Sequence, residues 1–213
     1  MQLKLDLHVH SHYSYDSLIK EKEITFYVKK RGLDGVAIVD HDRFDGAFKV
    51  AKETDVLVVP GMEVTSSGGH IIALNVQEAI PRALGPEETV DKIHDAGGLA
   101  VACHPVTFFK GSLRKDVNAK FDAVEVINAS AVPFNYSVKH SRRLAERLGA
   151  AQVAGTDAHY APEIGYAYTL VDAEPNVENV VKAISKRQCM PVGRATPWTL
   201  RLKKLLLVYG RRF

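Results

Sequence analysis

The feature that most constrains the fold of this sequence is a regular alternation of short β-branched runs with amphipathic helical stretches. Seven segments have the length and composition of strands: 2–9, 34–39, 55–59, 99–103, 123–127, 151–154 and 167–171. Helical patterns lie between most of them and begin near Lys20, Phe44, Pro86, Asn135 and Asn176. About seven strand–helix units in a row predict a parallel sheet covered by helices. The stretch from 66 to 76 predicts a glycine turn followed by an extra strand.

Local signals mark where these helices begin and end. Pro86 suits the first turn of a helix, where its missing N–H costs nothing, and Gly97 and Gly98 stop that helix. Gly149 ends the stretch that begins near Asn135. The pattern therefore fits either a closed barrel or an open sheet with helices on both faces.

The positions of the polar residues favour the barrel. His8 and His10 lie two residues apart on the first strand, so both imidazoles point to the same face. His41, Glu63 and His104 lie at or just after the ends of later strands, as do Asp157, His159 and Asn128. Barrel enzymes gather polar groups at the carboxyl ends of many strands, whereas an open sheet gathers only those beside its switch point. We therefore expect a closed or nearly closed barrel.

Histidines and carboxylates gathered in this way predict a metal site. Imidazole and carboxylate ligands without thiolate fit Zn, Mn or Fe, whereas Mg prefers an all-oxygen site. Cys103 precedes His104 on a strand and is interpreted as a packed apolar residue of the opposite face. No Gly-x-Ser-x-Gly or Walker A sequence offers a competing chemistry. Clustered metals suit phosphoester hydrolysis, and amide hydrolysis remains a chemical alternative.

Composition sets broad limits on the function. With 213 residues, 46% hydrophobic and 25% charged, the chain fits one domain, 1–213. A net charge of +3 does not by itself imply a nucleic-acid partner, but the tail 195–213 is basic and holds no acidic residue. Two cysteines indicate no disulfide framework. The N-terminus resembles no signal peptide and no apolar run could span a membrane, so we expect a cytoplasmic protein.

Six stretches carry a resemblance to a known family. Together they span most of the chain in the family's order: 6–11 (DLHVHS), 13–16 (YSYD), 35–42 (GVAIVDHD), 60–64 (PGMEV), 104–105 (HP) and 155–159 (GTDAH). The chain resembles the PHP (polymerase and histidinol phosphatase) domain superfamily, and is most similar to its short metal-dependent phosphoesterase branch. The resemblance implies a distorted (β/α)7 barrel with a metal site at the carboxyl ends of its strands.

The resemblance also implies how the ligands are shared among two or three divalent ions. His8, His10, Glu63 and Asp157 would hold one metal. Glu63 would bridge to a second, which His104 also holds, and a third would take Asp16, His41 and His159. One position departs from the pattern: where trinuclear members carry a further histidine, this chain has Asn128, which predicts a weakly held second metal.

A metal-activated hydroxide is then expected to attack the phosphorus of a nucleotide, a nucleoside bisphosphate or an RNA or DNA end. Asp157 and His10 are the candidate catalytic residues, with Asp157 also moving protons. Arg194 is the first candidate for phosphate binding. His70 is predicted either to donate to substrate or to orient Glu63, and Arg43 is a weaker candidate.

Two alternatives stay open at this stage. One is a non-catalytic RNA-binding subunit that resembles the barrel protein of RNase P, and the other is a histidinol phosphatase. The C-terminal stretch is expected to form a helix after Pro197. Its leucines 202, 205 and 206 would face the barrel, and its basic side chains would face solvent or track RNA.

Overall fold

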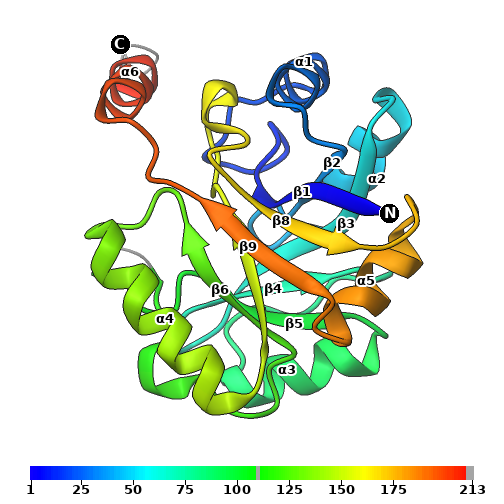
Figure 1. Cartoon of the computed structure of the whole chain (residues 1–213), viewed down its shortest axis with the longest axis vertical. Helices are drawn as coiled ribbons and strands as arrows, with labels where there is room; N and C mark the ends of the chain where they lie inside the picture. Colours follow the sequence, from blue (N-terminus) through cyan, green and yellow to red (C-terminus); the bar gives the residue numbers. More distant parts are fainter. Residues whose placement is uncertain (109–110, 210–213) are drawn as a thin grey trace.

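The computed structural model describes residues 1–108 and 111–209 and contains one mixed sheet that curls into a nearly closed barrel (Figure 1). The order of its strands is β7-β6-β5-β4-β3-β2-β1-β8-β9. The bounds of the strands are β1 Gln2–Val9, β2 Gly35–Ile38, β3 Leu57–Thr65, β4 His70–Leu74, β5 Leu99–Ala102, β6 Ala123–Asn128, β7 Ala151–Gly155, β8 Ala167–Asp172 and β9 Cys189–Gly193. The predicted distorted barrel is confirmed.

Two strands correct the expectation of a purely parallel sheet. β4 pairs antiparallel with both β3 and β5, and β8 pairs antiparallel with both β1 and β9. The turn 66–69 between β3 and β4 is too short for a crossover, so the chain forms a hairpin there. Because β3 runs on to Thr65, Glu63 lies within this strand rather than after it.

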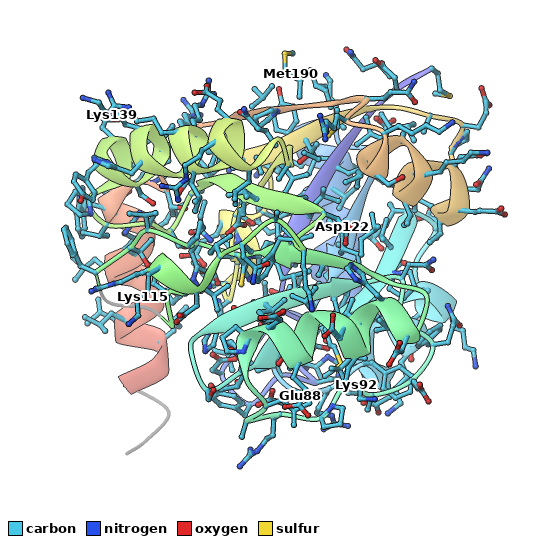
Figure 2. All side chains as sticks on the ribbon, turned by 90° about the horizontal axis from the view of Figure 1, so that it is seen from below. Glu88, Lys92, Lys115, Asp122, Lys139 and Met190 are labelled. Carbon is cyan, nitrogen blue, oxygen red and sulfur yellow. The ribbon has the colours of Figure 1, made fainter. Side chains whose placement is uncertain are left out.

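Helices cover the outside of the barrel. Their bounds are α1 Glu21–Arg31, α2 Asp45–Glu53, α3 Pro86–Asp95, α4 Phe134–Leu148, α5 Val177–Ser185 and α6 Trp198–Tyr209, with short 3-10 turns η1 Arg114–Asp116 and η2 Ala161–Glu163. Seen from below, α3 and α4 flank one face, and Glu88, Lys92 and Lys139 point outward (Figure 2). The expected helix starts agree with these bounds to within one residue.

Apolar side chains from the strands fill the barrel. Leu3, Leu5 and Leu7 of β1 belong to one buried cluster with side chains from β2 through β8. Only an interior face can bring side chains from so many strands into one cluster. Two further clusters lie between the strands and the helices, one under α3 and α4 and the other under α1 and α2.

The barrel closes where the end of β7 meets β1. Asp157 donates its backbone N–H to the carbonyl of His8 at 2.8 Å, and His10 donates to the carbonyl of Ala158 at 3.0 Å. A Cβ at Gly155 would lie 2.3 Å from the Cβ of His8, so only glycine permits this approach. Closure therefore places the first and seventh strands, and the polar residues at their ends, side by side.

The C-terminal helix α6 lies beyond the carboxyl ends of the strands (Figure 1). Contrary to expectation, Leu202, Leu205 and Leu206 are 58%, 51% and 64% exposed. Arg201 instead faces inward, and its guanidinium donates to the backbone carbonyls of Ala129, Ser130 and Thr196. These polar contacts fix the rotation of the helix, which the leucine spacing alone could not reveal.

Within the described residues, no helix combines the length and the apolar character needed to cross a bilayer.

Candidate metal centre

Polar side chains from several strands converge at the carboxyl end of the barrel. Strict alternation along β1 would turn His8 and His10 away from the face of Leu7, but the register shifts between Asp6 and Val9. The Nε2 atoms of His8 and His10 lie 3.2 Å apart, and Glu63 Oε2 lies within 3.2 Å of both. Asp157 Oδ1 lies 3.7 and 3.6 Å from the same two nitrogens.

A second group of side chains meets at the outer side of His10. Asp16 Oδ2 lies 3.0 Å from Nε2 of His159 and 3.4 Å from Nε2 of His41. The rings of His10 and His159 stack with centroids 4.1 Å apart. His10 therefore stands between two donor groups and offers its imidazole to both.

A third group forms on the opposite side of Glu63. Its Oε1 atom lies 2.9 Å from Nε2 of His104 and 2.9 Å from Nδ1 of His70. The two oxygens of Glu63 therefore face different histidines, as a bridging carboxylate requires. We refer to the eight predicted ligands as the donor cluster: His8, His10, Asp16, His41, Glu63, His104, Asp157 and His159.

The spacing of the donor cluster fits metal ions. Zn–N and Zn–O bonds of about 2.0–2.2 Å place tetrahedral ligands roughly 3.3–3.6 Å apart. The measured separations around His8, His10, Glu63 and Asp157 range from 3.1 to 3.7 Å. All four residues are buried, and such a concentration of carboxylates and imidazoles is expected to need a cation.

Electrostatics keep the carboxylates of the cluster ionised. Burial alone would raise the pKa of Glu63, but the charge of His8 and hydrogen bonds from His10, His104 and His70 hold it well below its usual range. The pKa of Asp16 is also lowered, since its interactions with His159 outweigh burial. Burial lowers the pKa of His41 to about 4, which leaves its imidazole neutral and able to bind a metal.

Two donors are held in strained backbone conformations. His104 has φ of 32° and Asp157 has φ of 57°, in the left-handed region that costs a non-glycine residue about 1 kcal/mol or more. Hydrogen bonds compensate, because the N–H of His104 donates to Glu125 Oε2 at 2.7 Å and that of Asp157 to the carbonyl of His8. The fold thus tolerates a cost in folding free energy at two positions whose backbone directs the side chains into the cluster.

Sequence reasoning missed Glu125, a buried residue of β6. Its Oε1 lies 3.0 Å from Nδ1 of His8, and its Oε2 also accepts from the side-chain amide of Asn128 at 2.9 Å. A carboxylate on the far nitrogen of a ligating histidine fixes its ring and tautomer. An acidic residue in the apolar run AVEVI was the available signal.

Asn128 has its amide engaged within the protein. Its nitrogen donates to Glu125 and, at 3.3 Å, to Asp157 Oδ2, while its oxygen accepts from the N–H of Ser130. This residue therefore orients two carboxylates, and the third group, which would hold the second predicted metal, consists of Glu63, His104 and their neighbours. Cys103, predicted to pack on the face opposite the site, instead has its Sγ 3.4 Å from Glu63 Oε1, so this buried side chain also borders the donor cluster.

The predicted substrate-binding residues lie in different places. His70 lines the cavity over the donor cluster and contacts Glu63 as well, so both interpretations of its role stay open. Arg194 stacks over Tyr166, 5.2 Å from the ring centroid, and does not line this cavity. Arg43 makes an exposed ion pair with Asp45 and also lies outside the cavity.

The fold and the donor cluster define the class of protein. It is an α/β barrel with a cluster of potential metal ligands at the carboxyl ends of its strands. A sequence model described as PHP-associated matches residues 136–189. A protein of Methanocaldococcus jannaschii is 39% identical over 141 residues, which cover 60% of this chain and 82% of that protein. The chain belongs to the PHP domain superfamily.

Solved structures of low sequence identity share the fold. A two-domain protein of Bacteroides vulgatus that contains a predicted PHP-like metal-dependent phosphoesterase matches with a TM-score of 0.74 at 16% identity, over 91% of this chain and 65% of that chain. The lesion-specific endonuclease Q of Pyrococcus furiosus matches with a TM-score of 0.60 at 17% identity, over 87% of this chain and 56% of that chain. Both neighbours extend well beyond the region that this chain matches.

Proposed function

We propose that the protein is a metal-dependent phosphoesterase that hydrolyses a phosphate ester, with a nucleotide, a nucleoside bisphosphate or the end of an RNA or DNA chain as substrate. The observation that carries the proposal is the convergence of the donor cluster around Glu63, whose two oxygens face histidines on opposite sides. The structural neighbours, which include a predicted PHP-like metal-dependent phosphoesterase and a lesion-specific endonuclease, support the same chemistry.

The donor cluster has the composition for Zn, Mn or Fe. Two or three such ions would supply Lewis acidity for the phosphoryl oxygens and activate water at neutral pH. The low pKa of Glu63 keeps a negative charge between the donor groups, and His10 belongs to two of these groups. Loss of either residue would therefore disturb more than one metal position.

Asp157 has a second role in the proposal. Its Oδ1 faces His8 and His10, while its Oδ2 accepts a hydrogen bond from Asn128. One oxygen thus faces the two ligand histidines, and the hydrogen bond from Asn128 fixes the orientation of the carboxylate that would also take up or release a proton. His70, on the wall of the cavity, is positioned to donate to a phosphoryl oxygen.

The substrate enters through an open cavity of about 290 Å³ lined by Tyr15, His70, Gly111 and residues of the donor cluster. A neighbouring hollow of about 430 Å³ continues from Asp16, Asp157 and His159 to Lys204 and Leu205 of α6. The two hollows share these three donors, so a phosphate at the cluster leaves room for a larger leaving group on the α6 side.

The test is turnover of a panel of phosphate esters, from an aryl phosphate to nucleotides and oligonucleotide ends, under Mn²⁺, Zn²⁺ and Fe²⁺. We expect the wild type to release phosphate or a nucleotide, and His10→Ala and Glu63→Ala to abolish release. Lys92→Ala, exposed on α3 and outside the cavity, is the control and should retain turnover. Equal turnover in wild type and in both donor variants would reject the proposed function.

A further inference from the structure

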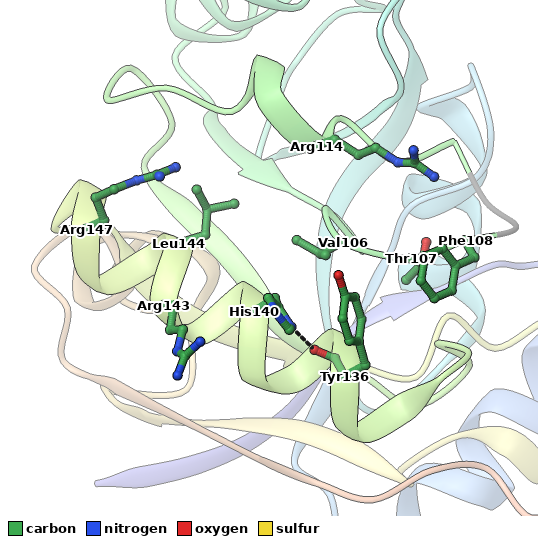
Figure 3. A pocket seen from close by; sticks show the side chains of 9 residues that line it. All are labelled: Val106, Thr107, Phe108, Arg114, Tyr136, His140, Arg143, Leu144 and Arg147. Atoms are coloured by element: carbon green, nitrogen blue, oxygen red, sulfur yellow. Dashed lines mark hydrogen bonds between the residues drawn. The ribbon is translucent and has the colours of Figure 1, made fainter.

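A separate pocket lies on the flank of the barrel, between α4 and the loop that follows β5 (Figure 3). Its volume is about 520 Å³, within the range of small-molecule and nucleotide sites. We refer to it as the arginine–aromatic pocket. The residues that give it its character are Phe108, Arg114, Tyr136, His140, Arg143 and Arg147.

The charge of this pocket is uniformly basic. Its described lining includes three arginines and no aspartate or glutamate. Within the described part of the chain, the guanidinium groups of Arg114, Arg143 and Arg147 form no ion pair, although ion pairs are common elsewhere on the surface. Guanidinium groups that no carboxylate neutralises are available for an anion, and phosphate suits their fork of donors.

Aromatic rings stand beside these cations. Phe108 and Tyr136 are 51% and 42% exposed and stack on each other with ring centroids 5.4 Å apart. His140 lies against Tyr136, with centroids 3.9 Å apart, and its Nδ1–H donates to the carbonyl of the same tyrosine. The exposed parts of these rings, next to arginines, offer a surface on which nucleobases can stack while their phosphates are neutralised.

The pocket is longer than one nucleotide. Tyr136 and Arg147 are separated by eleven residues of α4, or about 16 Å along the helix. The rise per nucleotide in one stacked strand is about 3.4 Å, so this length corresponds to several nucleotides. An acidic peptide could pair with the arginines but would leave the aromatic rings without planar partners, which favours a nucleic-acid strand.

One loop forms a wall of both the pocket and the metal centre. Phe108 and Arg114 line the arginine–aromatic pocket, whereas Gly111, between them, lines the cavity over the donor cluster. The loop is fastened to the cluster, because Ser112 Oγ donates to the carbonyl of His104 at 2.9 Å. Arg114 has φ of 50°, a strained conformation of the kind that often occurs at ligand sites.

We propose that the arginine–aromatic pocket binds the single-stranded part of a polynucleotide substrate, several nucleotides from the phosphate that occupies the donor cluster. The inference rests on the proposed function and narrows it to substrates with more than one nucleotide. RNA and DNA share the bases and phosphates that the pocket recognises, so the pocket itself accepts both. Phe108 and Tyr136 stack on bases, and the three arginines bind phosphates.

The proposal is tested by binding without turnover. Metal-free protein is titrated into a fluorescent ten-nucleotide single strand, once as RNA and once as DNA, and the anisotropy is recorded. Tyr136→Ala should weaken binding on the order of tenfold, since one stacked base is lost. Arg143→Glu should weaken it at least about tenfold, because a phosphate contact becomes a repulsion.

Arg142→Glu provides the matched control. Arg142 is the adjacent exposed residue of α4, but it lines a different hollow, next to Cys189 and Pro191. The charge change is identical, so binding should stay within about twofold of wild type if the pocket is specific. Thermal unfolding of each variant checks that α4 is still folded.

The results overturn the proposal in three cases: the wild type binds neither strand, the two arginine variants weaken binding equally, or Tyr136→Ala binds as tightly as wild type. Binding of either RNA or DNA with the expected loss in Tyr136→Ala and Arg143→Glu supports it. Failure of the proposed function is seen separately, as the absence of metal-dependent turnover of the aryl phosphate by the wild type.

Discussion

The donor cluster and the arginine–aromatic pocket lie on two sides of one loop and differ in burial, in charge and in how their side chains are paired. The cluster is mostly buried and rich in carboxylates, and its side chains are held by one another. The pocket is exposed and basic, and its arginines lack ion pairs within the described residues. Burial of a polar group costs free energy unless the group is paired, whereas exposed cations cost little until they bind. The first region therefore suits chemistry and the second suits substrate selection.

The largest expected effect is a loss of bound metal, which changes in the donor cluster, but not in the arginine–aromatic pocket, should cause. Glu63→Ala removes the carboxylate that lies between His8 and His104, so the amount of bound metal should fall. Turnover of any substrate should drop by at least about 10³-fold, which corresponds to several kcal/mol in the activation free energy. Elemental analysis and aryl phosphate hydrolysis measure the two losses. Metal content equal to that of wild type would show that Glu63 is not a ligand.

A second prediction concerns the pH dependence of the cluster. In the metal-free protein burial lowers the pKa of His8, but Glu125 and Glu63 outweigh burial and raise it from 6.5 to about 9. The stabilisation is fully present below pH 6.5 and is lost as pH rises through 9. Its size is on the order of 3 kcal/mol in the free energy of unfolding.

Urea unfolding of chelator-treated protein at several pH values between 6 and about 9 measures this loss. With divalent metal present the trend should reverse, because the metal competes with the proton for His8. In the metal-free protein, His8→Gln should flatten this slope, because it removes the imidazole whose pKa is raised. A metal-free protein that gains stability over this range would contradict the prediction.

A third, smaller effect is expected at Glu125, which touches the ligands without belonging to the donor cluster. Glu125→Gln keeps the shape of the side chain but weakens its hold on His8 Nδ1 and on the N–H of His104. Metal affinity should fall about 10- to 100-fold, as measured by calorimetric titration. Glu146→Gln, exposed on α4, is the isosteric control, and equal affinities of both variants would remove Glu125 from this role.

The same contrast explains what the sequence could reveal. His8, His10, Asp157 and His159 were predictable because a metal site needs donors at strand ends, and such donors follow the period of a strand. Asn128 was noticed as a departure, but its hydrogen bonds to Glu125 and Asp157 depend on how β6 and β7 pair. Short-range patterns do not contain that information.

The flank of the barrel was less predictable still. Tyr136 and Arg143 are seven residues apart on one helix, and Phe108 reaches them from a loop that only the tertiary fold brings near. The leucine stripe of α6 misled for the same reason, since Arg201 found carbonyl partners on the barrel and turned Leu205 outward. Helical spacing predicts that a face exists but does not identify what the face contacts.

The smallest expected effect is a change in the salt dependence of strand binding, which the arginine–aromatic pocket should show and the donor cluster should not. Arg147→Ala removes one exposed cation at the end of the arginine–aromatic pocket farthest from Tyr136 along α4. If Arg147 contacts one phosphate of the single strand, the slope of log binding constant against log salt concentration should become less steep by about 0.7. Anisotropy titrations of the ten-nucleotide strand at several salt concentrations measure it, with Lys139→Ala as the control on the same helix. A slope identical to that of wild type would indicate that the bound strand does not reach Arg147. The pocket would then hold fewer nucleotides than its length allows, with Arg114 and Arg143 as its phosphate contacts.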